Sequence, residues 1–225
     1  MEKVMPTPKQ ASQWYSLTDP VHGFDHVLRV LGLAEMIGEA LGADLAILRA
    51  AALLHDAEGA DPTNEGEGAN RATHQLASAD FARQVLSDEG WEEDRIKAVE
   101  HCIRSHRYRG EEAPESLEAR VLFDADKLDV LGAFGIARTI GYAVQAGQPV
   151  YAPVSARFEE TGETEADEPH SAYHEYRYKL RRVADRLHTR QAQKIAKDRV
   201  GLLDDYFQQL KSEVLGSPEG GQAQP

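Results

Sequence analysis

His55 and Asp56 stand side by side in the stretch AALLHDAEG, residues 51–59, where an apolar helical run ends. An imidazole next to a carboxylate at this point has two interpretations. It is either a core histidine bonded to a backbone carbonyl, with an acid beside it in water, or part of a metal site completed from elsewhere in the chain. Neutral imidazole nitrogens and ionised carboxylates together suit divalent ions such as Mn, Fe, Co and Zn.

Helical periodicity, at about 100° per residue, places further polar side chains on the apolar faces of expected helices. His26 shares a stripe with Val30, Leu33 and Ile37, and His55 continues the stripe of Leu45 and Leu48. The other inward polar residues by the same rotation are His74, His106, Asp126 and Asp129. His101, in contrast, points away from the apolar face of its helix.

An inward Asp126 requires an explanation, because a buried carboxylate is costly unless it is paired or bound to a cation. One divalent ion shared by His26, His55, Asp56 and Asp126 explains all four positions. Periodicity alone does not decide between this interpretation and ordinary core histidines. The single cysteine, Cys102, gives no support to a cysteine-based structural zinc site.

The elements that must position these side chains are all expected to be helices, since alternating strand patterns are nearly absent. Asp44 is expected to cap the helix that leads to His55. The expected helices span 26–42, 44–56, 70–87, 92–107, 116–130, 132–146, 172–187 and 189–214. The sequence therefore predicts an all-α fold.

The expected domain organisation is simple. An N-terminal segment (1–20) precedes a single domain (21–215), and residues 216–225 are expected to be a disordered tail. Within the domain, residues 147–171 are expected to be a long mobile loop, because they combine three prolines with the acidic stretch EETGETEADE.

Composition narrows the function classes. The chain of 225 residues has a formal net charge of −13, which disfavours binding to a nucleic-acid polymer. No apolar stretch approaches the roughly 20 residues of a membrane span, and the start lacks the apolar core of a signal peptide. One cysteine fits a reducing compartment, so we expect a cytoplasmic protein that does not associate with membranes.

Five blocks of the sequence resemble the HD-domain metal-dependent phosphohydrolases, in particular their YedJ/YpgQ-like branch. The blocks are HGFDHVLRV (22–30), LLHDAEG (53–59), HCIRSHRY (101–108), DADKLDVLGAFGIART (124–139) and LHTRQAQKIAKDR (187–199). The resemblance covers roughly residues 20–215 and implies an HD-domain helical bundle. It also implies that His26, His55, Asp56 and Asp126 bind one divalent metal, with Asp124 as a supporting neighbour. One departure is Gly23, where the branch usually has Asp.

The implied ion is Mn, with Mg, Fe, Co, Ni or Zn as alternatives, and the implied reaction is attack of metal-activated water on phosphorus. Cationic groups must stabilise the phosphoryl oxygens, and the candidates are Arg29, His106, Arg107 and Lys127. Asp56, Glu58 and Asp129 are alternative general bases. His74 with His106 is a candidate second metal site, and the basic helix 173–182 is either a surface or a lid.

The implied substrate is a small phosphorylated metabolite, most plausibly a nucleotide, with hydrolysis of a nucleoside triphosphate to monophosphate and diphosphate as the specific form. Alternatives within the class are a nucleotidase, a cyclic-nucleotide phosphodiesterase and a guanosine-polyphosphate hydrolase. A different class also fits: a binding or regulatory module in which the ion only ties helices together. The sequence leaves the oligomeric state open.

Overall fold

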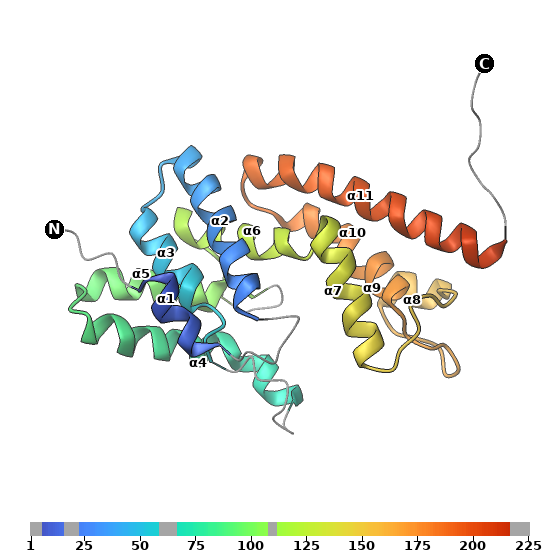
Figure 1. Ribbon diagram of the computed structural model, residues 1–225, viewed down its shortest axis with the longest axis horizontal. Coiled ribbons are helices and arrows are strands. Elements are labelled where there is room, and N and C mark those ends of the chain that lie inside the picture. Colours follow the sequence, from blue (N-terminus) through green and yellow to red (C-terminus); the bar gives the residue numbers. More distant parts are fainter. Residues whose placement is uncertain (1–5, 16–22, 59–66, 108–111, 217–225) are drawn as a thin grey trace, which may run out of the picture. The chain divides into compact units, whose positions relative to one another are not determined.

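The computed structural model describes residues 6–15, 23–58, 67–107 and 112–216, with residues 67–73 described by their helix alone. Every regular element in these ranges is a helix, which confirms the all-α prediction (Figure 1). The chain divides into two compact units. Unit 1 is Met1–Asp129 with Leu187–Ala192, and unit 2 is Val130–Arg186 with Gln193–Pro225. The single domain over 21–215 stays a prediction.

Unit 1 is a bundle built around α3, which packs against α2, α4, α5 and α6. In addition, α2 packs on α6, and α5 packs on both α4 and α6. The elements of this unit are α1 (Pro8–Ala11), η1 (Ser12–Trp14), α2 (Phe24–Leu41), α3 (Leu45–Leu54), α4 (Glu67–Asp88), α5 (Glu93–Ser105) and α6 (Leu117–Asp129). The polar ends of three of these helices, α2, α3 and α6, carry the candidate site.

The turn between α2 and α3 follows from a few residues. Gly42 ends α2 in the left-handed region, at φ 73°, which glycine adopts without steric cost. Asp44 then caps α3 as expected, since its carboxylate accepts hydrogen bonds from the amides of Ala46 (2.9 Å) and Ile47 (3.2 Å). The cap fixes where α3 starts and therefore where its last residues, before His55, lie.

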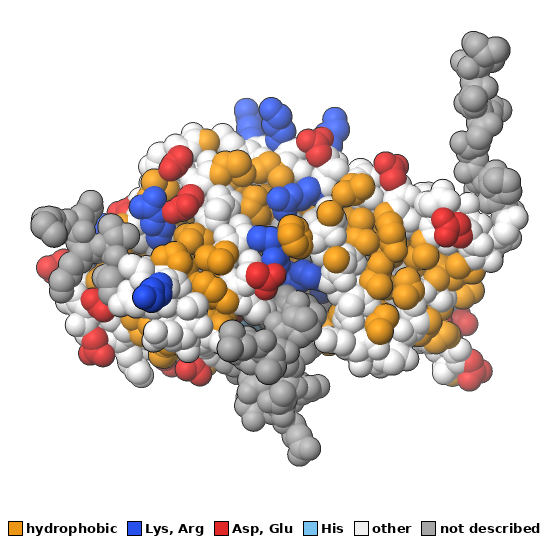
Figure 2. Space-filling view, viewed as in Figure 1, with side chains coloured by type: hydrophobic (Ala, Val, Ile, Leu, Met, Phe, Trp, Pro, Cys, Tyr) orange, Lys and Arg blue, Asp and Glu red, His pale blue; other side chains and the backbone are white. Residues whose placement is uncertain are grey.

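Unit 2 contains α7 (Gly132–Gln145), α8 (Ala156–Thr161), α9 (Ala172–Glu175), the π-helical turn η2 (Tyr176–Leu180), α10 (Arg181–Val183), η3 (Ala184–Arg186) and most of α11 (Arg190–Leu215). The core of this unit is aromatic: the rings of Tyr176 and Phe207 stack with centroids 4.4 Å apart. Hydrophobic side chains gather on the surface over α7, where Phe134 and Val144 are exposed (Figure 2).

The segment 147–171 contains a helix, α8, capped by the Ser155 hydroxyl, which accepts a hydrogen bond from the Phe158 amide (3.0 Å). Glu168 accepts hydrogen bonds from the Ser155 amide (2.6 Å) and hydroxyl (2.7 Å). It also lies 3.0 Å from Nε2 of the fully buried His174. The mobility expected for this segment stays a prediction, and the expected tail lies outside the described residues except for Gly216.

No helix in the described part of the chain is both long and apolar enough to cross a membrane.

Candidate metal centre

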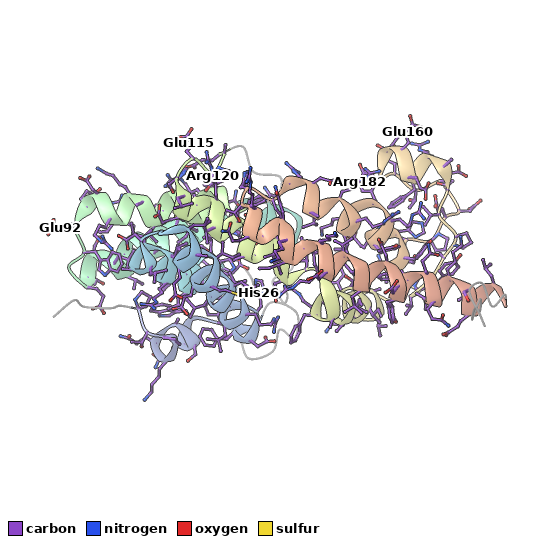
Figure 3. All side chains as sticks on the ribbon, turned by 90° about the horizontal axis from the view of Figure 1, so that it is seen from above. His26, Glu92, Glu115, Arg120, Glu160 and Arg182 are labelled. Carbon is purple, nitrogen blue, oxygen red and sulfur yellow. The ribbon has the colours of Figure 1, made fainter. Side chains whose placement is uncertain are left out.

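Four predicted ligands come together in unit 1. His26 lies in the first turn of α2, His55 is the residue that ends α3, Asp56 follows it, and Asp126 lies in α6. Ligand atoms of His26, His55 and Asp56 all lie within 4.8 Å of one another. Asp126 joins them, since its Oδ1 lies 3.4 Å from His26 Nε2. Figure 3 labels His26 among the side chains of α2.

The hydrogen bonds on the far side of the imidazole rings fix which nitrogen carries the proton. His55 Nδ1 lies 2.8 Å from the Ala52 carbonyl oxygen, which only accepts, so Nδ1–H is the donor. His26 Nδ1 lies 2.7 Å from Asp129 Oδ2 and donates to that carboxylate. In both rings Nε2 therefore presents a lone pair toward the carboxylates of the cluster.

The Nε2 atoms of the two histidines approach the Asp56 carboxylate without a proton between nitrogen and oxygen. His55 Nε2 is 3.4 Å from Asp56 Oδ2, and His26 Nε2 is 3.8 Å from the same oxygen. His55 Nε2 and Asp56 Oδ1 are buried and make no hydrogen bond among the described residues. A buried polar atom without a partner is costly. A divalent cation satisfies these acceptors together, so the residues fit the metal that the sequence predicts.

The electrostatics keep the candidate ligands in the protonation states that bind a metal. Burial lowers the pKa of His55 to about 4, so its imidazole is neutral at physiological pH. Burial pushes the pKa of Asp56 upward, but the adjacent imidazoles, His55 first, hold it well below its usual range. Burial also pushes the pKa of Asp126 upward, but the positive charge of Lys127 outweighs it. The pKa of Asp126 is therefore also well below its usual range.

A second group of potential ligands shares Asp56. His74 Nε2 lies 3.4 Å and His106 Nε2 lies 3.5 Å from Asp56 Oδ1, and the three side chains offer ligand atoms within 4.8 Å of one another. His106 donates Nδ1–H to the Ile103 carbonyl oxygen at 2.5 Å. Its Nε2 therefore also presents a lone pair to Asp56. The structure thus brings together the pair that the sequence suggested for a second metal.

The other candidate residues lie at different depths around the cluster. Lys127 Nζ is 2.5 Å from Asp126 Oδ2. Arg29 donates through Nε to Asp129 Oδ1 (2.7 Å) and through Nη1 to the exposed Asp25 (2.6 Å), so it faces Asp129. Glu58 has an exposed side chain, while its backbone bonds Ser78. Arg107 is half-buried.

Tyr15 is a contributor that sequence reasoning missed. Its buried hydroxyl donates to the Leu53 carbonyl oxygen at 3.0 Å, two residues before His55. The ring packs on Phe24 of α2, with centroids 5.5 Å apart. Tyr15 therefore ties the N-terminal segment to the ends of both helices that carry the histidines. Its only sequence signal is an aromatic pair, Trp14 and Tyr15, ahead of the block HGFDHVLRV (22–30).

A helical bundle that gathers two histidines and two aspartates from these helices is the arrangement of an HD domain. The family model for the HD domain matches residues 23–131, and the chain belongs to the HD-domain family. Among its relatives is the uncharacterized protein YpgQ from Bacillus subtilis (strain 168). It is 33% identical over 218 residues, which are 92% of this chain and 95% of YpgQ.

Solved structures agree with this assignment. The crystal structure of B. subtilis YpgQ in complex with ADP has a TM-score of 0.68 at 29% identity, covering 92% of this chain and 98% of that one. A Lactobacillus plantarum protein has a TM-score of 0.71 at 26% identity, covering 95% and 100%. An HD-superfamily hydrolase from Bacillus thuringiensis has a TM-score of 0.66 at 27% identity, covering 94% and 96%.

Proposed function

We propose that this protein is a divalent-metal-dependent phosphohydrolase that acts on a small phosphorylated substrate, a nucleotide. The observation that carries the proposal is the pair of buried acceptors without hydrogen bonds, His55 Nε2 and Asp56 Oδ1. A group that only supported the fold would be expected to satisfy them with protein donors. The relationship to an HD-superfamily hydrolase supports hydrolysis as the reaction class.

In this proposal His26, His55, Asp56 and Asp126 hold the ion, with Mn as the expected metal. When bound, the ion supplies Lewis acidity, which lowers the pKa of water and offsets charge on phosphoryl oxygens. The two imidazoles enter as neutral ligands, because each keeps its proton on Nδ1 and donates it in a hydrogen bond, His55 to the Ala52 carbonyl oxygen and His26 to Asp129. Their orientation is thus fixed before the ion arrives, as is typical of histidine ligands.

Lys127, His74 and His106 are the proposed substrate-facing groups. The Lys127 ammonium pairs with Asp126 and is placed beside the ligand set, where its charge would stabilise a phosphoryl oxygen. The two imidazoles face the other oxygen of Asp56, and each has the chemistry to bind a phosphoryl oxygen or move a proton there. Arg107 is proposed to add charge, and Arg29 to act through Asp129.

For the general base we favour Asp56 over the two other carboxylates. Asp129 accepts hydrogen bonds from both His26 and Arg29, so its oxygens are already used to hold the His26 ring in place. The Glu58 side chain is exposed. Asp56 Oδ1, in contrast, is buried at the cluster and faces His74 and His106. Because the pKa of Asp56 is held low, a proton that it abstracts would not stay on the carboxylate and would pass to one of these imidazoles.

A nucleotide is the proposed substrate because the relative YpgQ has been crystallised with ADP. Cleavage of a triphosphate to monophosphate and diphosphate is the specific form of the proposal. A nucleotidase, a cyclic-nucleotide phosphodiesterase and a guanosine-polyphosphate hydrolase use the same site chemistry, and the substrate panel below separates them. The competing class is a metal-stabilised binding module without catalysis.

The test combines metal content with turnover. Purified protein is analysed for bound metals, and phosphate or diphosphate release is then measured with Mn²⁺ over nucleoside mono-, di- and triphosphates. We expect one tightly held divalent ion, Mn-dependent release, and loss of both in Asp56→Ala. Asp185→Asn, which changes an exposed carboxylate of unit 2, is the matched control and should retain both.

Two outcomes would overturn the proposal. If the wild type keeps its metal but is as inert as Asp56→Ala over the whole panel, the ion is structural and the binding-module class is correct. If neither protein holds a divalent ion and Mn²⁺ does not raise the melting temperature of the wild type, the four side chains do not form a metal site. Ligand binding to the folded state must raise that temperature.

A further inference from the structure

A cluster of arginines in unit 2 plays no part in the metal centre. The turn η2 and helix α10 contribute Arg177, Arg181 and Arg182, and these line a cavity of 310 Å³ together with Glu159 of α8. Figure 3 labels Arg182 on α10 and the neighbouring Glu160 on α8. The lining carries three positive charges and one negative charge in a chain whose formal net charge is −13.

The three guanidinium groups are held in place by the rest of unit 2. Arg182 lies over the Tyr178 ring, 4.7 Å from its centroid, and donates to the Glu159 carbonyl oxygen at 3.0 Å. Arg177 pairs with the Glu159 carboxylate. These contacts fix the side chains against the last turn of α8, so little conformational entropy remains to be lost when a ligand binds.

A second anchor lies on α11. Arg181 Nε is 3.2 Å from Asp204 Oδ1, and its guanidinium lies 5.8 Å from the Tyr176 ring centroid. The Tyr176 hydroxyl donates to the same Asp204 oxygen at 2.7 Å. The π-helical turn widens the backbone at Tyr176–Leu180 and leads directly into Arg181 and Arg182. Such turns often occur at functional sites.

These anchors use a minority of the available donors. Each guanidinium has five N–H groups in a planar fork, and the contacts described above occupy only one or two of them. Glu159 and Asp204 offset two of the three positive charges, and the one that remains, with the unused donors, matches the oxygens of an anion. Guanidinium forks bind phosphate in a bidentate manner, and the cavity volume is at the lower end of the range for small-molecule sites.

We propose that Arg177, Arg181 and Arg182 form a binding site in unit 2 for a small ligand that carries a diphosphate group. A single carboxylate or phosphate has too few oxygens to reach the unused donors of all three guanidinium groups, whereas a diphosphate presents enough oxygens for three forks. Glu159 limits the affinity for the diphosphate, because its carboxylate competes with the ligand for Arg177. The proposal is independent of catalysis at the metal centre.

The test uses inorganic diphosphate and the full chain without divalent metal, so that the metal centre cannot bind the probe through an ion. Calorimetric titration at low ionic strength should show one site. Binding should weaken about tenfold or more in Arg182→Gln, as expected for loss of charge-assisted hydrogen bonds. Arg157→Gln is the matched control, since Arg157 is an exposed arginine of α8 that pairs with Glu163 outside the cavity.

Glu159→Gln gives a result of opposite sign that a purely structural role would not produce. Removing the competing carboxylate should strengthen diphosphate binding severalfold, although it also removes the Arg177 ion pair. Two further ligands show which part is recognised. ADP should bind about as well as diphosphate, and adenosine should not bind.

The proposal fails if the wild type does not bind millimolar diphosphate, or if Arg157→Gln weakens binding as much as Arg182→Gln. It also fails if Lys127→Gln abolishes binding, since the probe would then occupy the metal centre. Binding of an acidic peptide but not of diphosphate would show that the arginines form a protein-binding surface instead. Melting temperatures of all variants confirm that each is folded.

Discussion

His26 Nδ1 and Asp129 Oδ2 lie 2.7 Å apart in the buried part of unit 1. The same carboxylate accepts hydrogen bonds from Arg29, through Nε at 2.7 Å and Nη2 at 3.1 Å. The imidazole thus has its donor nitrogen fixed on α6, and its Nε2 is directed at Asp126 from the same helix. Two aspartates three positions apart therefore face the two nitrogens of one ring, and Asp129 holds it in place.

Asp129→Asn should therefore weaken metal binding about 10- to 100-fold, the usual effect of losing the partner of a histidine ligand. Titration with Mn²⁺, followed by calorimetry, measures this. Asp25→Asn removes the other carboxylate that pairs with Arg29 and should leave the affinity unchanged. Unchanged metal affinity with lost turnover in Asp129→Asn would show that Asp129 acts in the reaction itself.

Asp124 is expected to support the fold rather than the metal. Its buried carboxylate accepts hydrogen bonds from the amides of His188 (2.8 Å) and Thr189 (2.7 Å), directly before α11 begins. Asp124→Ala leaves both amides without this partner and should lower the free energy of unfolding by about 2 kcal/mol. Urea denaturation measures the change. An unaltered midpoint in Asp124→Ala would contradict the capping role.

Two glycines of α7 should respond oppositely to the same substitution. A Cβ atom on Gly135 would lie 2.1 Å from the Val130 carbonyl oxygen, so Gly135→Ala must displace backbone and should cost about 2 kcal/mol or more. A Cβ on Gly141 meets nothing within 4 Å. Gly141→Ala should then stabilise the helix by up to about 1 kcal/mol. Thermal unfolding of both variants measures these opposite effects. Equal melting temperatures of the two variants would refute the close approach of Gly135 to Val130.

Glu168 should make the stability of unit 2 depend on pH. Burial pushes the pKa of this carboxyl upward, but hydrogen bonds from Ser155 and the Glu165 amide outweigh it and lower the pKa to about 2, from an ordinary value of 4.5. A depressed folded-state pKa stabilises the protein above pH 4.5, and this contribution is lost as the pH falls from 4.5 through 2.

The measurement is the melting temperature of the wild type and Glu168→Gln between pH 2 and 7. The wild type should melt higher above pH 4.5, and the two curves should converge toward pH 2. A difference that is constant over the whole range would show that Glu168 contributes through packing and not through its charge.

Much of this molecule is determined locally and was therefore predictable. Helical periodicity placed His26 and His55 on apolar stripes, and both are buried. The cap at Asp44 follows from contacts within four residues, which a sequence displays directly. The ordered motifs identified the HD-domain family, because their residue types and order are visible without a structure.

The segment 147–171 shows what local signals leave undetermined. Its prolines and acids predict a loop, and the sequence gives no sign that the half-buried Glu168 contacts His174 and Ser155. Likewise, the sequence predicts only that the basic helix 173–182 forms a surface or a lid. The convergence of its arginines with Glu159 on one cavity depends on a π-helical turn and on side chains about twenty residues away.

The sequence alone therefore settled the helical class, the family and the inward direction of the metal-competent side chains, since these depend on spacing along one helix. Tertiary structure decided which atom of each side chain meets which partner. Asp126 and Asp129 are indistinguishable by periodicity, yet one faces Nε2 and the other Nδ1 of His26. That assignment depends on how α2 packs on α6, and the distance between two helices is not encoded in the periodicity of either.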